Sequence, residues 1–239
     1  MRVAVVSDVH GNLTALEAVI ADLRKVAPDV VLQGGDLAYG GARPREVVDR
    51  VRELRWAGVR GNTDEILWAP ESLREFAASA PPLKKPLEIT EQLRAWACPK
   101  LGAERIAWLE SMPMVQRSGE LAVVHASVQD TWRGPGRDAG EAEFEKAFGM
   151  LGARVVVYGH IHVPFVRNIG EWTVANAGSV SLSYDGDGRA SYALVDGEKV
   201  EIRRVAYDVE REAEAAKTAA MPHSRWLETC LRAGRYVAP

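Results

Sequence analysis

The sequence is poor in cysteine and has no long apolar run. Its only cysteines, Cys98 and Cys230, form no CxxC pair, so we expect neither a disulfide framework nor a zinc ribbon. No window approaches the roughly 18 apolar residues that span a membrane. The first apolar run, residues 3–6, stands near the start without a signal-type segment. These absences predict a soluble cytoplasmic protein.

The sequence also lacks a strong excess of either charge. A formal net charge of −3 gives no electrostatic reason to expect general nucleic-acid binding. Its 239 residues can bury a substantial core, and 47% apolar content is ordinary for a globular domain. These numbers therefore give no sign of a membrane or nucleic-acid partner, and a homo-oligomer stays open.

The first third of the chain alternates strand-like runs with amphipathic helices. This βαβαβ order predicts parallel strands near residues 3–6, 30–32 and 59, with helices from about 13 and over 44–54. Residues 66–109 predict a helical insertion with a proline-rich break at Pro81-Pro82. Its tryptophans either pack the insertion onto the main body, or part of the insertion overhangs the active site and selects substrate.

Strand-like runs return after the insertion, and the chain ends in a helical segment. We expect strands at 121–124 and 154–158, separated by a helical stretch. A five-stranded β-meander follows, over residues 165–166, 172–175, 180–184, 190–195 and 200–205. Residues 210–217 predict a charged surface helix. Strand–helix units followed by a meander indicate two packed sheets with helices outside.

Histidine is scarce, yet four of the five histidines follow apolar runs. Asp8 and His10 come after the first strand, and residues two apart on an extended backbone project to one face, so this pair can hold one ion. His160 and His162 repeat the arrangement. Read alone, Asp8 could be a turn residue and His10 an accidental neighbour.

Single polar residues end three other predicted strands. Asp36, Asn62 and His125 stand there, and each could by itself be a turn or core residue. In open α/β sheets, however, sites form beyond the carboxyl ends of the strands. One convergent metal site explains all these positions together. Carboxylate, amide and imidazole ligands for two metals indicate hydrolysis of a phosphate ester.

The ordered blocks Asp-x-His, Gly-Asp, Gly-Asn, isolated His and Gly-His-x-His resemble the calcineurin-like metallophosphoesterase superfamily. The opening segment looks like the small bacterial and archaeal YfcE-like phosphodiesterase branch. The resemblance covers about residues 1–207. It implies an α/β fold, a four-layer αββα sandwich of two mixed sheets, with the helical insertion at about 66–109. Residues 208–239 would form a C-terminal helical tail.

The resemblance also implies a ligand set. One metal would be held by Asp8, His10, Asp36 and His162, and a second by Asp36, Asn62, His125 and His160, with Asp36 bridging. Manganese is the metal expected in vitro, while iron, zinc, cobalt or nickel also suit these ligands. Asp36, Asn62 and His125 would be catalytic. A hydroxide bridging the two metals would attack phosphorus in phosphodiesters, and monoesters could also be substrates. The implied partner is a small-molecule phosphate ester or a nucleotide.

One position departs from the family pattern. Many members carry histidine after the Gly-Asn pair, and Thr63 stands there instead, so the proton donor to the leaving group is open. Asp64 could replace it or could only stabilise a turn. Candidate phosphate contacts are Asn12, Arg60, Thr63 and Arg133, although each arginine could be a plain surface residue.

Two other functions stay open. Arg60-Gly61-Asn62 matches dinucleoside-polyphosphate hydrolases and protein phosphatases, but the residues that should follow differ. A non-catalytic, protein-binding scaffold on the same fold is the alternative of another class, and the complete ligand set disfavours it.

Overall fold

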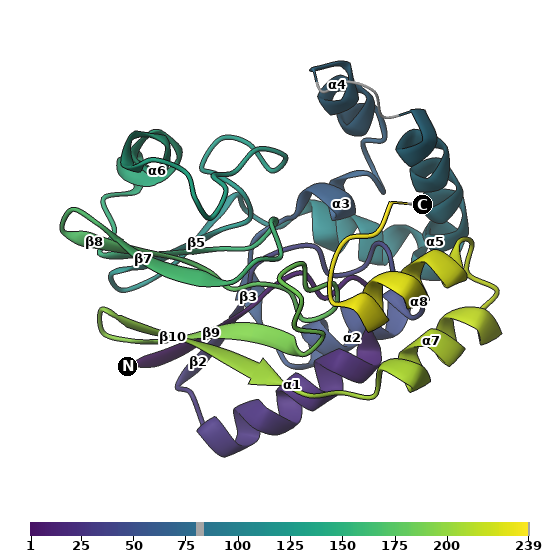
Figure 1. The fold of residues 1–239 in the computed structure, drawn as a ribbon, viewed down its shortest axis with the longest axis horizontal. Coiled ribbons are helices and arrows are strands. Elements are labelled where there is room, and N and C mark those ends of the chain that lie inside the picture. The colour runs from purple at the N-terminus through teal and green to yellow at the C-terminus, as the bar shows by residue number, and fades with distance from the viewer. Residues whose placement is uncertain (80–83, 239) are drawn as a thin grey trace.

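The protein is described by a computed structural model that covers residues 1–79 and 84–238. Two mixed five-stranded sheets pack face to face, and helices cover their outer sides (Figure 1). The predicted α/β class and four-layer sandwich are confirmed.

The first sheet has the strand order β10-β9-β1-β2-β3, and its last three strands are parallel, as predicted. The crossover helices are α1 (Leu13–Val26) and α2 (Pro44–Glu53). The strands are β1 (Arg2–Val6), β2 (Val30–Gln33), β3 (Ala57–Gly58), β9 (Ala190–Asp196) and β10 (Lys199–Val205).

The second sheet has the order β4-β5-β6-β8-β7, with parallel pairing from β5 through β6 to β8. Helix α6 (Glu141–Phe148) and a 3-10 turn (Gly149–Leu151) connect β5 to β6 and pack on its outer face. The strands are β4 (Val115–Ser118), β5 (Leu121–Val124), β6 (Val155–Tyr158), β7 (Phe165–Ile169) and β8 (Trp172–Asn176).

The predicted single meander is wrong. Strands β7 and β8 belong to the second sheet, whereas β9 and β10 join the first sheet beside β1. Residues 180–184 form no strand, because Val180 N–H donates to the Ser7 carbonyl and Ser181 N–H to the Asp8 carbonyl. This segment therefore lies against the loop that follows β1.

Strand β1 shows how the layers are held together. Val3 and Val5 face the second sheet, where they meet Val123 and Val157, while Ala4 and Val6 face the helices. A strand buried on both faces reads as a continuous apolar run, which explains the sequence of β1. Its carboxyl end is thereby fixed in the middle of the sandwich.

The predicted insertion contains α4 (Glu71–Ser79) and α5 (Lys84–Glu110), which bends at Gly102, and it follows the short helix α3 (Asn62–Glu65). The predicted break at Pro81-Pro82 lies outside the described residues. Trp68, Trp96 and Trp108 pack against the main core, so the insertion is joined to the body of the protein.

Two helices, α7 (Val209–Thr218) and α8 (Ser224–Ala233), precede the C-terminal segment. The prediction that residues 210–217 lie on the surface is wrong for one face of α7. Glu212 is fully buried there and forms an ion pair with Arg43 beside α2. Among the described residues, no helix is long and apolar enough to cross a membrane.

Candidate metal centre

The seven predicted ligand residues meet at one edge of the sandwich, beyond the carboxyl ends of five strands. Six of them are buried and His160 is half-buried. Asp8 and His10 follow β1, Asp36 follows β2, Asn62 begins α3 after β3, His125 follows β5, and His160 and His162 follow β6.

Five of these residues have a positive φ angle. The values range from 45° at His10 to 69° at His160, with Asp8, Asp36 and His162 between them. The expectation that pairs two apart converge through an extended backbone is therefore wrong. The chain leaves each strand through left-handed turns, which Asp and His tolerate better than most residues. Each such residue costs about 1 kcal/mol, and the surrounding hydrogen bonds hold it.

Backbone carbonyls fix three of the imidazole rings. The Nδ1 atoms of His10, His125 and His162 lie 2.8, 2.8 and 2.6 Å from the carbonyl oxygens of Tyr39, Gly34 and Leu182, in that order. A carbonyl oxygen only accepts, so each Nδ1 carries a proton and donates it. Each Nε2 is left with its lone pair, which is the arrangement of metal-binding histidine.

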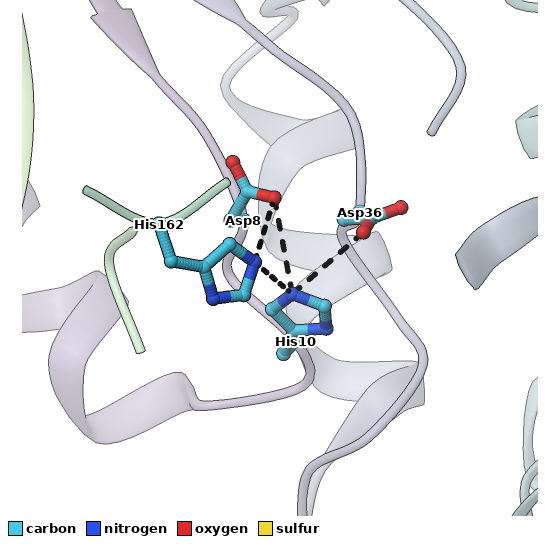
Figure 2. Close-up of side chains that lie close together, drawn as sticks. All are labelled: Asp8, His10, Asp36 and His162. Atoms are coloured by element: carbon cyan, nitrogen blue, oxygen red, sulfur yellow. Dashed lines mark hydrogen bonds and ion pairs between the residues drawn. The ribbon is translucent and has the colours of Figure 1, made fainter. Parts of the chain in front are cut away.

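The first cluster consists of Asp8, His10, Asp36 and His162, whose ligand atoms all lie within 4.8 Å of one another. Figure 2 shows the rings of His10 and His162 turned toward each other beneath Asp8. Their Nε2 atoms are 3.2 Å apart, and Asp8 Oδ1 is 3.1 Å from His162 Nε2. Three acceptors thus converge, and a cation between them would relieve their repulsion.

The second group consists of Asp36, Asn62, His125 and His160. Asn62 Oδ1 lies 2.8 Å from His125 Nε2 and 3.0 Å from His160 Nδ1. Asp36 Oδ2 connects the two sets, being 3.7 Å from His10 Nε2 and 3.5 Å from His125 Nε2. Asp36 Oδ1 accepts from Thr63 N–H at 2.9 Å, which orients the carboxylate.

The electrostatics differ among the histidines. Burial lowers the pKa of His10, and burial with the charge of His125 lowers the pKa of His160 to about 4. Burial also acts to lower the pKa of His125, but the charges of Asp36 and Asp8 outweigh it and raise that pKa. The space between His125 and Asp36 therefore attracts positive charge, whether from a proton or a metal ion.

Asp64 supports the loop that carries Asp36. Its two carboxylate oxygens accept the N–H groups of Leu37 and Ala38 at 2.7 and 2.9 Å. Burial and the charge of Asp36 raise the pKa of Asp64 to about 7. This is the turn-stabilising role considered from the sequence, and it holds Asp36 at the end of β2.

An apolar cavity of about 210 Å³ opens beside the first cluster. We call it the aromatic pocket. Its described lining residues are His10, Tyr39, Gly40, Thr63, Ile89, Thr90, Leu93, Leu182, Tyr184, Trp226 and Tyr236. Sequence reasoning missed most of them, because they come from separate segments and carry no metal-ligand pattern. Helix α5 contributes three of them, so the insertion both packs on the body and reaches the candidate site.

The residues predicted to contact phosphate lie in different surroundings in the structure. Thr63 lines the aromatic pocket, and its buried hydroxyl has no hydrogen-bond partner among the described residues. Asn12 caps α1 by accepting from Ala15 N–H and donates to Ser181. Arg60 donates to the Met112 carbonyl. Phosphate binding by Asn12 and Arg60 stays a prediction.

Arg133 lies on a different cavity, of about 300 Å³, whose described lining includes none of the seven predicted ligands. Its guanidinium pairs with Asp130 at 3.0 Å and lies over the ring of Phe76. A phosphate contact by Arg133 likewise stays a prediction.

Comparisons with known proteins identify relatives of similar sequence and fold. The family model of the calcineurin-like phosphoesterase superfamily domain matches residues 1–199. The uncharacterized protein MJ0912 of Methanocaldococcus jannaschii is 28% identical, over 98% of each chain. The crystal structure of a metallophosphoesterase from Sphaerobacter thermophilus is 29% identical, with a TM-score of 0.78 over 98% of this chain and 99% of that one. The hypothetical protein PH1004 of Pyrococcus horikoshii OT3 shares the fold at 18% identity, with a TM-score of 0.81 over 99% of both chains.

Proposed function

Since the chain belongs to the calcineurin-like phosphoesterase superfamily, we propose that it is a metal-dependent hydrolase of phosphodiesters, with monoesters as further substrates. The observation that carries this proposal is the convergence of Asp8, His10 and His162, whose acceptor atoms face one another. The donor chemistry of these residues fits a divalent cation.

We assign the first cluster to one metal and the second group to another. The position of Asp36 Oδ2 between His10 and His125 supports a bridging role for this carboxylate. Two divalent metals, when bound, supply Lewis-acid activation of water and neutralise charge on the phosphoryl oxygens. Manganese is the metal that we expect to support activity in vitro.

The residues of the chain position the ester. Thr63 holds Asp36 through its backbone N–H, and its unpartnered hydroxyl can donate to a phosphoryl or leaving oxygen. A hydroxyl is a poorer proton donor than an imidazolium, so esters with acidic leaving groups are the expected substrates.

The lack of positively charged residues in the described lining of the aromatic pocket favours diesters over more highly charged esters. None of its described lining residues is Lys or Arg. Additional phosphate groups need such cations. This observation argues against a dinucleoside polyphosphate with its phosphate chain in this pocket. A cytoplasmic location stays a prediction, and a homo-oligomer stays open.

Hydrolysis of bis(p-nitrophenyl) phosphate with added manganese tests the proposal. We expect activity that a chelator removes, and loss of activity in Asp36→Asn and His125→Ala proteins that keep the wild-type circular dichroism. Asp138→Asn, at an exposed carboxylate that is not among the seven predicted ligands, is the matched control and should stay active. Full activity in metal-stripped Asp36→Asn protein would overturn the proposal.

A further inference from the structure

The aromatic pocket begins at the metal centre and is walled by segments that are distant in sequence. His10 of the first cluster and Thr63 line it, together with Ile89 from α5 and Tyr236 from the C-terminal segment. In Figure 1 this last segment leaves α8 and runs toward α3 and α5. A substituent on a phosphate ester bound at the first cluster would therefore enter this pocket.

The polar groups of two aromatic lining residues already form hydrogen bonds within the protein. The Tyr39 hydroxyl donates to the Thr90 carbonyl at 2.9 Å, and Trp226 Nε1 donates to the Val237 carbonyl at 2.6 Å. These bonds fix both rings at their polar ends. What the two side chains offer to a ligand is consequently apolar ring surface.

The aromatic rings form a row that leads outward from the cluster. Tyr184 stacks on His162, with ring centroids 4.6 Å apart. Tyr236 meets the edge of Tyr184 at 5.8 Å and that of Trp226 at 6.3 Å. Tyr236 is half exposed, so the row of rings extends from the buried His162 to the protein surface. Stacked and edge-to-face pairs are the geometries by which aromatic walls bind a further ring.

Size and charge narrow the class of ligand. About 210 Å³ is less than the roughly 300–1,000 Å³ of a site for a drug-sized ligand, so there is room for a single ring system. Apart from His10 and the tyrosines, no described lining residue is ionisable. A charged substituent would lose its hydration there without gaining a partner.

We propose that the aromatic pocket binds an uncharged planar ring in the organic part of the ester, such as an aryl group or one nucleobase. This inference rests on the proposed function, because it assumes that the phosphate group lies at the metal centre.

A matched pair of phosphonates tests the proposal. Phenylphosphonate and methylphosphonate share the same head group and differ in the ring. Calorimetry with the manganese-loaded full chain should show at least about ten-fold tighter binding of phenylphosphonate. Cyclohexylphosphonate should bind more weakly than phenylphosphonate, and equal binding of these two would overturn the preference for a planar ring.

Substitutions in the aromatic pocket test whether the phenyl ring of the ligand binds there. Ile89→Trp fills the pocket from α5 and should abolish the preference for phenyl over methyl. Glu88→Trp, at the exposed neighbouring position, is the control and should keep the preference. If Ile89→Trp does not fold, Tyr236→Ala removes an outer wall at a half-exposed position and should reduce the preference several-fold.

The outcomes separate this inference from the proposed function. Equal binding of phenyl- and methylphosphonate, together with hydrolysis of the aryl diester, would overturn the pocket assignment and leave the enzyme assignment standing. A preference that survives both Ile89→Trp and Tyr236→Ala would also overturn it. Absence of hydrolysis and of binding by either phosphonate would overturn both proposals.

Discussion

The imidazole of His162 stacks on the phenol ring of Tyr184, with centroids 4.6 Å apart and planes inclined by 25°. His162 Nδ1 also donates to the Leu182 carbonyl, and Tyr184 N–H donates to the His162 carbonyl. The segment 180–184 therefore fixes the orientation and the tautomer of a candidate metal ligand. It connects the first cluster to the aromatic pocket.

Replacing the stacked ring should weaken metal binding. We expect Tyr184→Leu to lower manganese affinity about ten-fold, because partners that orient metal-binding histidines contribute about 10- to 100-fold. Tyr184→Phe keeps the ring and should bind manganese like the wild type. Titration calorimetry measures both. Equal affinity in the Leu and Phe variants would show that the stack does not position His162.

Acid should release the two metals in order. Histidine must be neutral to bind metal, so a ligand with a raised pKa loses metal to protons at a higher pH. The pKa of His125 is raised, whereas that of His10 is lowered and that of His160 is about 4. As the pH falls, manganese bound should decrease from two equivalents to one before it decreases to none, with the metal at His125 leaving first. Simultaneous loss of both equivalents would contradict this order.

A side chain at Gly61 should displace Asp36. A Cβ atom there would overlap Asp36 Oδ1 and the Asp36 backbone nitrogen. We expect Gly61→Ala to reduce activity by about 100-fold or more, because the bridging carboxylate must move. At Gly136, a Cβ atom would meet nothing within 4 Å, so Gly136→Ala is the control and should be fully active. Near-normal activity of Gly61→Ala would mean that the position of Asp36 is not critical.

Restoring an imidazole at Thr63 should change the dependence on leaving group. Thr63→His adds a proton donor beside His10 in the aromatic pocket. General acid catalysis contributes about 10² to 10⁴ in rate, mainly for basic leaving groups. We expect kcat for an alkyl ester to rise at least about ten-fold relative to a p-nitrophenyl ester. Thr63→Leu also enlarges the side chain but adds no proton donor and should show no gain, so the same ratio in both variants would refute a role for the imidazole as proton donor.

The buried Glu212–Arg43 pair should stabilise the junction between α7 and the first sheet's helices. Glu212 is fully buried, and its removal leaves the Arg43 charge without that partner. Glu212→Ala should lower the free energy of unfolding by about 3 kcal/mol in urea denaturation. Glu214→Ala, on the exposed face of the same helix, should change it by less than about 0.5 kcal/mol. Equal effects of the two substitutions would contradict the importance of the pair.

The sequence predicts well which polar residues meet beyond the strands, because their signal is local. Asp8, His10 and Asp36 are polar residues at the ends of apolar runs, and such ends meet at one edge of a parallel sheet. The left-handed backbone conformation of these residues cannot be predicted from the local sequence. Asp and His occupy both the ordinary and the left-handed regions, and the choice depends on hydrogen bonds to distant chain segments.

The errors arise where distant contacts decide the structure. Val180 and Leu182 alternate with serines, which is typical of a strand. However, the Ser179 hydroxyl donates to the Asp8 carbonyl and accepts the N–H groups of Ser181 and Leu182, which holds the segment as a loop. Strand β9 pairs with β1 across almost the whole chain, and no local pattern specifies that partner.

The position of Tyr236 at the rim of the aromatic pocket has a practical consequence. Any polypeptide fused to the C-terminus begins a few residues from that rim and competes with ligands for the same opening. The N-terminus lies on the opposite side of the molecule, where β1 enters the sheet (Figure 1). Affinity tags, fluorophores and surface tethers therefore belong at Met1, and a C-terminally immobilised protein is expected to underestimate ligand affinity.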